Sequence, residues 1–373
     1  GVWRDNDYPG AACDIPSHLY SFSFEPNPDW TRVFAPQPEI HTYLRQCIGK
    51  YDLRRHLRLK SEVVACSFNE ASACWYVTLG DGSTLAAKHV IAATGQLSRP
   101  FIPELSGLDC FAGAMFHSSR WQHSCNLGGA NVAVVGTGAS AAQFLPIIAE
   151  QAKTVTVFQR SAAYTLPRRD RSYSAFERWL FRRFAPLAAL NRLRVFVQHE
   201  ARALAFVQFP KLIEFFVRRQ FERSLERQVS DSEMRQRLQP DYPMGCKRIV
   251  VSDDYLATFD KSNVRLVSDK IARVVRDGIQ TEGGASHRAD VIVFATGFDA
   301  TSFLAPMRVK GRNGYELNQM WSDGAGAHLG ISVPNFPNFF ILYGPNTNLG
   351  HNSVIYMLES QIAHVLRCLK AVN

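Results

Sequence analysis

The sequence lacks paired cysteines, metal-binding spacings and long hydrophobic runs. Its eight cysteines are scattered, with no C-x-x-C pair, which argues against a zinc site and against the redox dithiol of a disulfide reductase. Scattered cysteines of this kind indicate reduced thiols. No signal peptide is apparent, and no apolar run approaches the roughly 18 residues of a membrane span. We therefore expect a cytoplasmic protein without a metal ion or a transmembrane helix.

Acidic residues are few relative to basic ones. The 42 Lys and Arg residues outnumber the 33 Asp and Glu residues, which gives a formal net charge of +9. Such an excess can attract nucleic acid or a membrane surface. The arginines are concentrated between Arg168 and Arg237, so the excess is local and we expect no nucleic-acid partner. The length of 373 residues allows two or more domains with sizeable cores.

A glycine-rich loop lies between an apolar run and a helical pattern. The run at 132–135 predicts a buried strand, and the motif G-x-G-x-x-A follows it. The first glycine of such a motif permits a tight turn, the second lets the backbone approach a pyrophosphate, and the small last residue allows close helix–strand packing. The helix then offers its free N–H groups to the phosphates. The predicted dinucleotide-binding residues are Gly136, Thr137, Gly138, Ala139, Ser140, Ala141 and Gln143.

The end of the next predicted strand, at 154–158, indicates which dinucleotide binds. NAD sites usually carry Asp or Glu there to hold the ribose hydroxyls, but this chain has Arg160 and Ser161. A cation and a hydroxyl suit a 2′-phosphate, so we predict NADPH. The alternative is that Arg160 is an ordinary solvated surface residue.

Two apolar segments end in Ala-Thr-Gly, one at 88–95 and one at 289–297. A buried strand that ends in small residues is expected where a doubly wound domain closes beside its cofactor. The second segment would close the NADPH domain, and the first would close another nucleotide domain whose glycine-rich loop lies upstream of Gly1. We therefore predict an α/β protein with two Rossmann-like dinucleotide-binding domains, the first of which lacks its N-terminal β-α-β unit.

Other patterns predict local structure. Ile213, Val217, Phe221 and Leu225, spaced by four within a helical segment at 168–239, predict an apolar stripe among arginines. A domain-capping helix has this pattern, and so does a helix lying on a membrane; we favour the former. The remaining expectations are an extended loop at 1–14, strands at 20–24, 63–65, 75–79 and 337–343, a hairpin turn at Asp81-Gly82, and helices at 38–49 and 353–372.

Phe111, Gly113, His117 and Trp121 form the motif F-x-G-x-x-x-H-x-x-x-W directly before the nucleotide loop. Nearly the whole chain resembles the class B flavoprotein monooxygenases of the Baeyer–Villiger type. The resemblance rests on this motif, the two Ala-Thr-Gly segments, the loop at 1–14, Gly245-Cys246-Lys247-Arg248 and Gly344-Pro345-Asn346-Thr347. Trp121 favours the ketone oxidisers, since related N-oxygenating enzymes usually have Tyr or Phe there. Gln122 departs from the family's usual Pro or Asp.

The resemblance implies FAD and NADPH as cofactors and assigns the domains. Residues 1–126 and 298–373 would form the FAD domain, and 127–297 the NADPH domain with a helical insertion at about 170–240. The first strand, glycine-rich loop and helix of an FAD domain are absent, so the N-terminus is expected to be incomplete. Family members also usually extend past Asn373.

The chemistry implied by the resemblance requires a fixed positive charge. NADPH reduces FAD, dioxygen adds at the flavin C4a, and the resulting peroxide attacks a small-molecule ketone, which rearranges to an ester or lactone. Anionic oxygens in such a reaction are stabilised by a guanidinium, which stays protonated and offers several donors. The resemblance gives this role to Arg248, oriented by Asp14, and places Lys247 with Arg160 at the 2′-phosphate. The alternative is that Lys247-Arg248 is an exposed basic pair.

The resemblance also implies further site residues. His117 and its motif are expected to lie in a linker and to act as a hinge that couples NADPH binding to domain movement, with Trp121 as a packing anchor. The phenylalanines of the helical insertion would suit a pocket for an apolar ketone. The remaining cofactor-binding residues are Val2, Trp3, Arg4, Asp5, Ala12, Cys13, Asp14, Tyr20, Val63, Asn346, Thr347 and Asn352.

Two other functions remain open. One is a flavin monooxygenase that oxygenates amines or thioethers. The other is an inactive fragment that binds NADPH at most, because the absent strand would leave backbone groups unpaired inside a parallel sheet. In that case residues 1–373 alone would purify without a yellow flavin.

Overall fold

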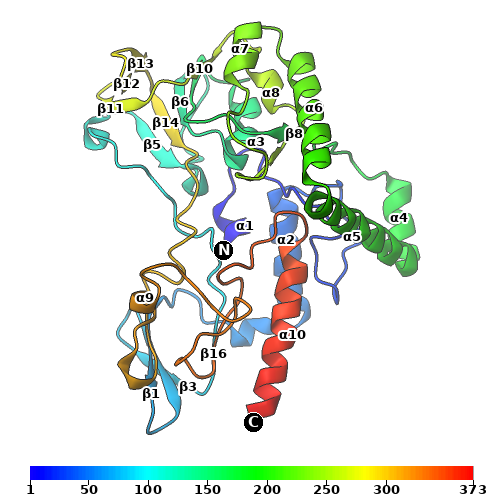
Figure 1. Cartoon of the computed structure of the whole chain (residues 1–373), viewed down its shortest axis with the longest axis vertical. Coiled ribbons are helices and arrows are strands. Elements are labelled where there is room, and N and C mark those ends of the chain that lie inside the picture. Colours follow the sequence, from blue (N-terminus) through cyan, green and yellow to red (C-terminus); the bar gives the residue numbers. More distant parts are fainter. Residues whose placement is uncertain (373) are drawn as a thin grey trace. The chain divides into compact units, whose positions relative to one another are not determined.

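The computed structural model describes residues 1–372 and divides into two compact units (Figure 1). The first unit comprises 1–19, 26–43 and 100–297, and the second comprises 20–25, 44–99 and the chain from 298 onwards. Residues 1–126, predicted to be the first part of one domain, are divided about equally between these two units. The assignment of each cofactor to a domain stays a prediction.

The first unit is built on a parallel sheet of five strands in the order β10–β7–β6–β14–β5. Every neighbouring pair in it is parallel. All of β14 is buried, as is β6 after its first residue, which is typical of a sheet covered on both faces. The strands are β5 (Ala114–His117), β6 (Asn131–Val135), β7 (Thr154–Phe158), β10 (Val264–Val267) and β14 (Val291–Phe294).

Successive residues of β6 enter two different cores, as the alternation of side chains in a strand requires. Val132 and Val134 pack with Phe144 of α3 (Ala139–Ile148). Ala133 packs on the other face, against the antiparallel sheet of β11 (Ile271–Val275), β12 (Gly278–Thr281) and β13 (Ser286–Arg288). The short helix α8 (Tyr255–Thr258) joins the α3 side. The predicted strand–loop–helix–strand order and the α/β class are confirmed.

The helical segment is also present. It consists of α4 (Ala175–Arg183), α5 (Ala185–Gln208), α6 (Pro210–Gln228) and α7 (Ser232–Arg237), drawn in green in Figure 1. It begins at 175 rather than 168, because Ser174 and Glu177 form a capping box at the start of α4. Phe221 and Leu225 lie in the core with Tyr164, so the predicted apolar stripe faces inward. The strands β8 (Thr165–Leu166) and β9 (Val250–Val251) pair in parallel on either side of this segment.

The second unit contains a four-stranded sheet in the order β15–β1–β2–β3 and a two-stranded sheet of β16 and β4. Trp75 is fully buried between them and donates from Nε1 to the Pro337 carbonyl oxygen at 2.8 Å. The hairpin at Asp81-Gly82 joins β2 and β3 as predicted. The elements are β1 (Val63–Asn69), β2 (Cys74–Leu79), β3 (Thr84–Ala87), β4 (Val90–Ala92), α9 (Leu317–Met320), β15 (Arg308–Lys310), β16 (Phe339–Ile341) and α10 (Val354–Val372).

The helix predicted at 38–49 is α2 (Gln37–Lys50). Ile40, Tyr43 and Cys47 are buried along one side of it. The helix begins at Gln37, whose backbone N–H donates to the Ala11 carbonyl oxygen at 2.8 Å.

Three local predictions were wrong. Residues 20–24 form bends instead of a strand, and their aromatic alternation reflects stacking of Phe22 on Phe24 at 5.1 Å. The expected loop at 1–14 contains one helical turn, α1 (Val2–Asp5). In β4, Ile91 is 45% exposed, because a two-stranded sheet has too few neighbours to bury both faces.

Residues 1–372, which the structure describes, contain neither a metal-binding cluster nor a membrane-spanning helix. No group of three or more His, Cys, Asp or Glu side chains in that range is arranged to hold a metal ion. No helix described there is long and apolar enough to cross a membrane. None of the eight cysteines, all within the described residues, forms a disulfide.

Candidate active site

The glycine-rich turn joins β6 directly to α3. Gly136 has a φ of +109°, and a Cβ on it would lie 2.5 Å from the Ala295 carbonyl oxygen, so only glycine fits. Around Gly138 a Cβ would meet nothing within 4 Å, which leaves open space beside the backbone. Ala141 is completely buried against the sheet. No side chain caps the N-terminus of α3, so its first N–H groups are open to an anion.

Basic and hydroxyl groups gather beside this turn. Thr137 donates from Oγ1 to the Ser161 carbonyl oxygen at 3.0 Å. Lys247 donates from Nζ to the Ser161 hydroxyl at 2.6 Å and lies 4.3 Å above the Tyr242 ring. Arg160 is exposed. The structure therefore places Lys247 and Ser161 together at the end of β7, where the 2′-phosphate was predicted.

The loop at 7–14 packs against the same helix. The Ala12 N–H donates to Gln143 Oε1 at 2.8 Å, and a Cβ on Gly10 would lie 2.6 Å from the Gln143 carbonyl oxygen. Tyr8 lies edge-on to Phe144 at 5.9 Å and hydrogen-bonds Ser140, while burial raises the pKa of its phenol. Tyr8 and Gly10 were not among the predicted site residues. The Tyr-Pro-Gly sequence was the available signal, since Gly after Pro is typical of a tight turn.

Asp14 and Arg248 form an ion pair, with 2.6 Å between Oδ2 and Nη2. Their side chains are 30% and 56% exposed, so one side of the pair remains open to a small molecule. Next to it, Cys13 is buried and its N–H donates to the Ala35 carbonyl oxygen at 3.0 Å. Burial, together with the charge of Asp14, raises the pKa of the Cys13 thiol. The Arg248 guanidinium thus pairs with the Asp14 carboxylate, and the Cys13 thiol is buried one residue before that carboxylate.

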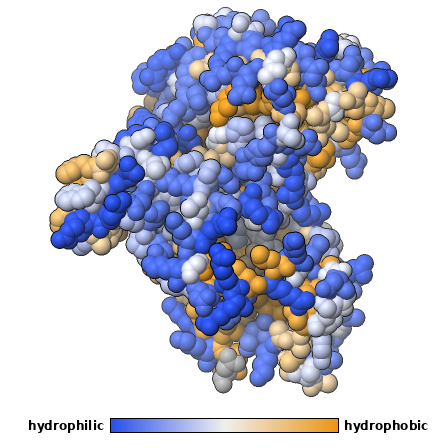
Figure 2. Space-filling model, turned by 180° about the vertical axis from the view of Figure 1, so that it is seen from behind, coloured by the Kyte–Doolittle hydropathy of each residue, from blue (hydrophilic) through white to orange (hydrophobic). Residues whose placement is uncertain are grey.

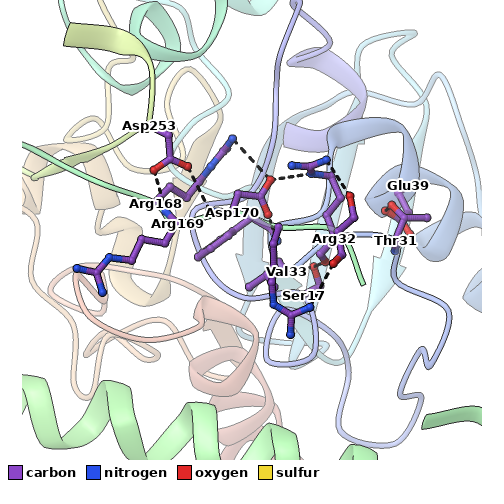
Figure 3. Close-up of polar contacts among 12 residues, drawn as sticks. Ser17, Thr31, Arg32, Val33, Glu39, Arg168, Arg169, Asp170 and Asp253 are labelled. Atoms are coloured by element: carbon purple, nitrogen blue, oxygen red, sulfur yellow. Dashed lines mark hydrogen bonds and ion pairs between the residues drawn. The ribbon is translucent and has the colours of Figure 1, made fainter. Parts of the chain in front are cut away.

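A polar network ties the segments that carry this pair (Figure 3). Asp170, whose side chain is 5% exposed, accepts from Arg32 Nε at 2.7 Å and from the Phe34 N–H at 3.2 Å. Asp253 accepts from the N–H groups of Arg169 and Asp170 at 2.8 and 3.2 Å. The segment that leads into α2 is thereby joined to the segment after β8, and that segment is joined to the chain after β9. None of these residues was predicted.

A cavity of about 430 Å³ adjoins this network, wholly within the first unit. Arg168 lines it and has an Nε that is buried without a hydrogen-bond partner among the described residues. The cavity is lined by Asp7, Tyr8, Pro9, Gly10, Ala11, Ala12, Arg32, Phe34, Pro36, Gln37, Pro38, Arg168 and Asp170.

The F-x-G-x-x-x-H-x-x-x-W motif is part of the sheet and not a linker, which corrects the prediction. His117 ends β5, where its Nδ1 accepts from the Ser119 N–H at 3.1 Å and its ring hydrogen-bonds the Gly297 backbone. Burial lowers its pKa. A Cβ on Gly113 would lie 2.2 Å from the Asp290 carbonyl oxygen, so the motif needs glycine there.

The aromatic residues of the motif are packing groups. Trp121 lies 5.2 Å from the rings of both Phe116 and Phe144, so its predicted packing role is confirmed. Phe111 packs against the core on the β11 side of the sheet. The proposed hinge function of the motif stays a prediction.

The predicted residues at the N-terminus lie on α1. The Trp3 carbonyl oxygen accepts from Gln37 Nε2, and Arg4 pairs with Asp5 at 2.7 Å. Val2 is exposed. The hydrogen bond between Trp3 and Gln37 joins α1 to the start of α2.

Tyr20, Val63, Asn346, Thr347 and Asn352 belong to the second unit. Asn346 and Thr347 line a cavity of about 530 Å³ within that unit, whereas Val63 lies on β1. Gln361 also lines this cavity and is 4% exposed. Its Oε1 accepts from the Tyr343 N–H at 2.9 Å, while its Nε2 has no partner in the described chain. An orphaned buried donor of this kind calls for a polar ligand or water.

Comparison with known proteins identifies the family. The model of the flavin-binding monooxygenase-like family matches residues 12–313. A protein named Baeyer-Villiger monooxygenase from Pseudomonas aeruginosa is 42% identical over 373 residues, which cover all of this chain and 71% of that protein. Another from Streptomyces coelicolor is 41% identical over all of this chain and 72% of its own.

Solved structures agree with these sequence matches. A steroid monooxygenase bound to NADP is 32% identical, with a TM-score of 0.87 over 100% of this chain and 79% of that one. OTEMO in complex with FAD and NADP is 28% identical, with a TM-score of 0.86 over 98% and 78% of the two chains. The chain therefore belongs to the flavin-binding monooxygenase-like family and, within it, to the Baeyer–Villiger monooxygenases.

Proposed function

We propose that this protein uses FAD and NADPH to insert one oxygen atom of O2 beside the carbonyl group of a ketone, which yields an ester or lactone. It is an oxidoreductase of the monooxygenase class, and we place it in the cytoplasm. The Asp14–Arg248 ion pair, held beside a dinucleotide turn, is the single observation that carries the proposal.

The residues around the turn fit NADPH. The open space beside Gly138 and the uncapped start of α3 would receive the pyrophosphate. Lys247, Ser161 and Arg160 would hold the 2′-phosphate, for which a lone carboxylate at the end of β7 would be repulsive. In this proposal residues 127–297 act as the NADPH domain.

FAD would be held by residues of 1–126 and 298–373. Asn346, Thr347 and Asn352 precede α10, and Thr347 and Asn352 are buried. The unpartnered Nε2 of Gln361 in the adjoining cavity fits a polar group in that unit. Reduced FAD supplies the electrons that activate dioxygen, and the protein's part is to position and stabilise charge.

Arg248 is proposed to stabilise the negative charge that develops on oxygen as the carbonyl is attacked. Its guanidinium stays protonated throughout. Nη2 donates to Asp14, so the other N–H groups of the guanidinium are available to the reacting oxygen. Asp14 restricts the rotamers of Arg248, so the donors are aimed before the reaction begins. Because Cys13 remains a neutral thiol, it does not compete as a second anion.

The test measures ketone-dependent NADPH consumption and ester formation in the FAD-loaded protein, with flavin content read from its absorbance. Arg248→Ala should lower ester formation by roughly 100- to 1000-fold, the loss typical of one oxyanion donor. NADPH binding should change little. Arg265→Ala, an exposed arginine on β10, is the control and should keep parent activity.

Two results would contradict the proposal. Ester formation by Arg248→Ala near the parent rate would remove Arg248 from the chemistry. Oxygenation of a thioether or an amine without any ester from a panel of ketones would instead favour the heteroatom-oxygenating alternative.

A further inference from the structure

Helices α4 to α6 expose many large apolar side chains; we call residues 175–219 the α4–α6 arm. Soluble monomers rarely expose large contiguous apolar patches, and those that do usually use them for interaction. In the view from behind, the lobe at the left, where α4 lies, shows pale orange residues among blue ones (Figure 2). The exposed apolar residues of the arm are Phe176, Trp179, Phe184, Leu187, Leu190, Leu193, Val197, Leu204, Phe206, Val207, Phe209, Leu212, Phe215 and Phe216.

The apolar residues of α5 form a stripe that faces away from the rest of the first unit. Leu190, Val197 and Leu204 recur every seven residues and therefore lie along one face of the helix. They are 61%, 53% and 63% exposed. Ala188 and Val195, also seven residues apart, are buried on the opposite side. The exposed stripe is thus distinct from the packing face of α5 and from the inward stripe on α6.

The arm is also strongly basic. Residues 175–219 contain nine Lys and Arg residues and three Asp and Glu residues, an excess of six in a chain whose net charge is +9. Glu177 pairs with Arg171, and Glu214 pairs with Arg218. A second copy of the arm would bring the same excess charge and be repelled, whereas an anionic surface would be attracted.

We propose that the α4–α6 arm docks the protein on an anionic phospholipid bilayer, lying in the interface without crossing it. Amphipathic helices with Phe, Trp and Leu on one face and Lys or Arg around it bind membranes in this way. Trp179, stacked on Phe176, is an aromatic anchor of the type found at headgroup depth. The turn between α5 and α6, at Phe209 and Pro210, presents a further apolar tip with Lys211 beside it. Neither α5 nor α6 is apolar enough to span a bilayer.

The experiment is co-sedimentation of the full chain with vesicles of phosphatidylcholine alone or mixed with phosphatidylglycerol. The parent protein should pellet with the mixed vesicles and lose binding as salt is raised. The double variant Leu190→Glu/Leu204→Glu should abolish pelleting. Lys211→Glu changes the charge by two units and should weaken binding to the mixed vesicles roughly 25-fold, since each unit of charge near an anionic surface changes partitioning about fivefold.

Matched controls distinguish a loss of membrane binding by the arm from unfolding and from the general effect of added negative charge. Leu59→Glu/Leu85→Glu changes two exposed leucines outside the arm and should bind like the parent. Thermal unfolding of every variant should match the parent, since all these side chains are exposed. Parent protein that stays in the supernatant with mixed vesicles would overturn the proposal. So would equal losses in the arm and control variants, or a soluble dimer that only the arm variant dissociates.

Discussion

Three glycines near the nucleotide turn allow backbone strain, steric overlap and ligand approach to be measured separately. Gly129 has a φ of +72° and would place a Cβ in open space. Gly136 combines a φ of +109° with a Cβ position 2.5 Å from the Ala295 carbonyl oxygen. Gly138 has an ordinary φ of −78° and open space. Replacing each by alanine therefore changes a different quantity.

The expected losses in the free energy of unfolding follow from this geometry. Gly129→Ala should cost about 1 kcal/mol, because a positive φ disfavours a side chain while alanine also reduces the entropy of the unfolded chain. Gly136→Ala should cost roughly 3 kcal/mol or more, since a buried carbonyl must also move. Gly138→Ala should be neutral or slightly stabilising, by up to about 1 kcal/mol.

The affinity for NADPH should follow a different order. Gly138→Ala places a methyl group where the pyrophosphate is proposed to approach, so the Kd should rise at least about tenfold, which corresponds to roughly 1.4 kcal/mol. Gly129→Ala should leave the Kd unchanged. Urea denaturation measures the first quantity and titration with NADPH the second. If Gly138→Ala binds NADPH like the parent, the phosphates do not approach the backbone there and the proposed site is wrong.

Three further predictions concern the surroundings of the site. Asp170→Asn should lower the free energy of unfolding by roughly 1–2 kcal/mol, less than for a fully buried pair because Arg32 is 43% exposed. Glu282→Gln, at the exposed pair with Lys270, is the control and should change the free energy of unfolding little. Equal effects of the two substitutions in urea denaturation would show that burial of Asp170 does not strengthen its ion pair. Burial, with the charge of Arg192 nearby, lowers the pKa of His18 from 6.5 to about 4. Between these two pH values the unfolded chain binds the proton more readily, so stability should fall as pH falls, by roughly 3 kcal/mol, and a His18→Gln protein with the same pH slope in urea denaturation would contradict this. Gly113→Ala should lower the free energy of unfolding by at least about 2 kcal/mol through overlap with the Asp290 carbonyl oxygen, and an unchanged Tm would show that the strand can shift.

The parts of the fold that could be predicted from the sequence have local signals. The strand, turn and helix at 131–148 lie next to one another in the chain, and each has its own periodicity or glycine requirement. The inward stripe on α6 was predicted for the same reason. Residues 20–24 show the limit, since alternating aromatics stacked on each other instead of pairing as a strand.

The site depends on contacts between distant residues, and these have no local signal. Asp14 and Arg248 are 234 positions apart, and their pairing was expected only from the family resemblance. Asp170 is one acidic residue in an arginine-rich segment, so nothing in the neighbouring sequence shows whether its carboxylate is buried in an ion pair or exposed at the surface. The family resemblance placed His117 in a linker, and the sequence gives no local signal against this, since β5 has four residues and its partner β14 comes much later in the chain.

Lys247 and Arg248 are adjacent in the chain, yet they contact different partners: Lys247 contacts Ser161, and Arg248 contacts Asp14. Neighbouring Cα atoms are held about 3.8 Å apart, so a shift of the backbone at one of these residues also shifts the other. The Lys247–Ser161 and Arg248–Asp14 contacts therefore share one short stretch of backbone, and any movement of that stretch would change both of them at once.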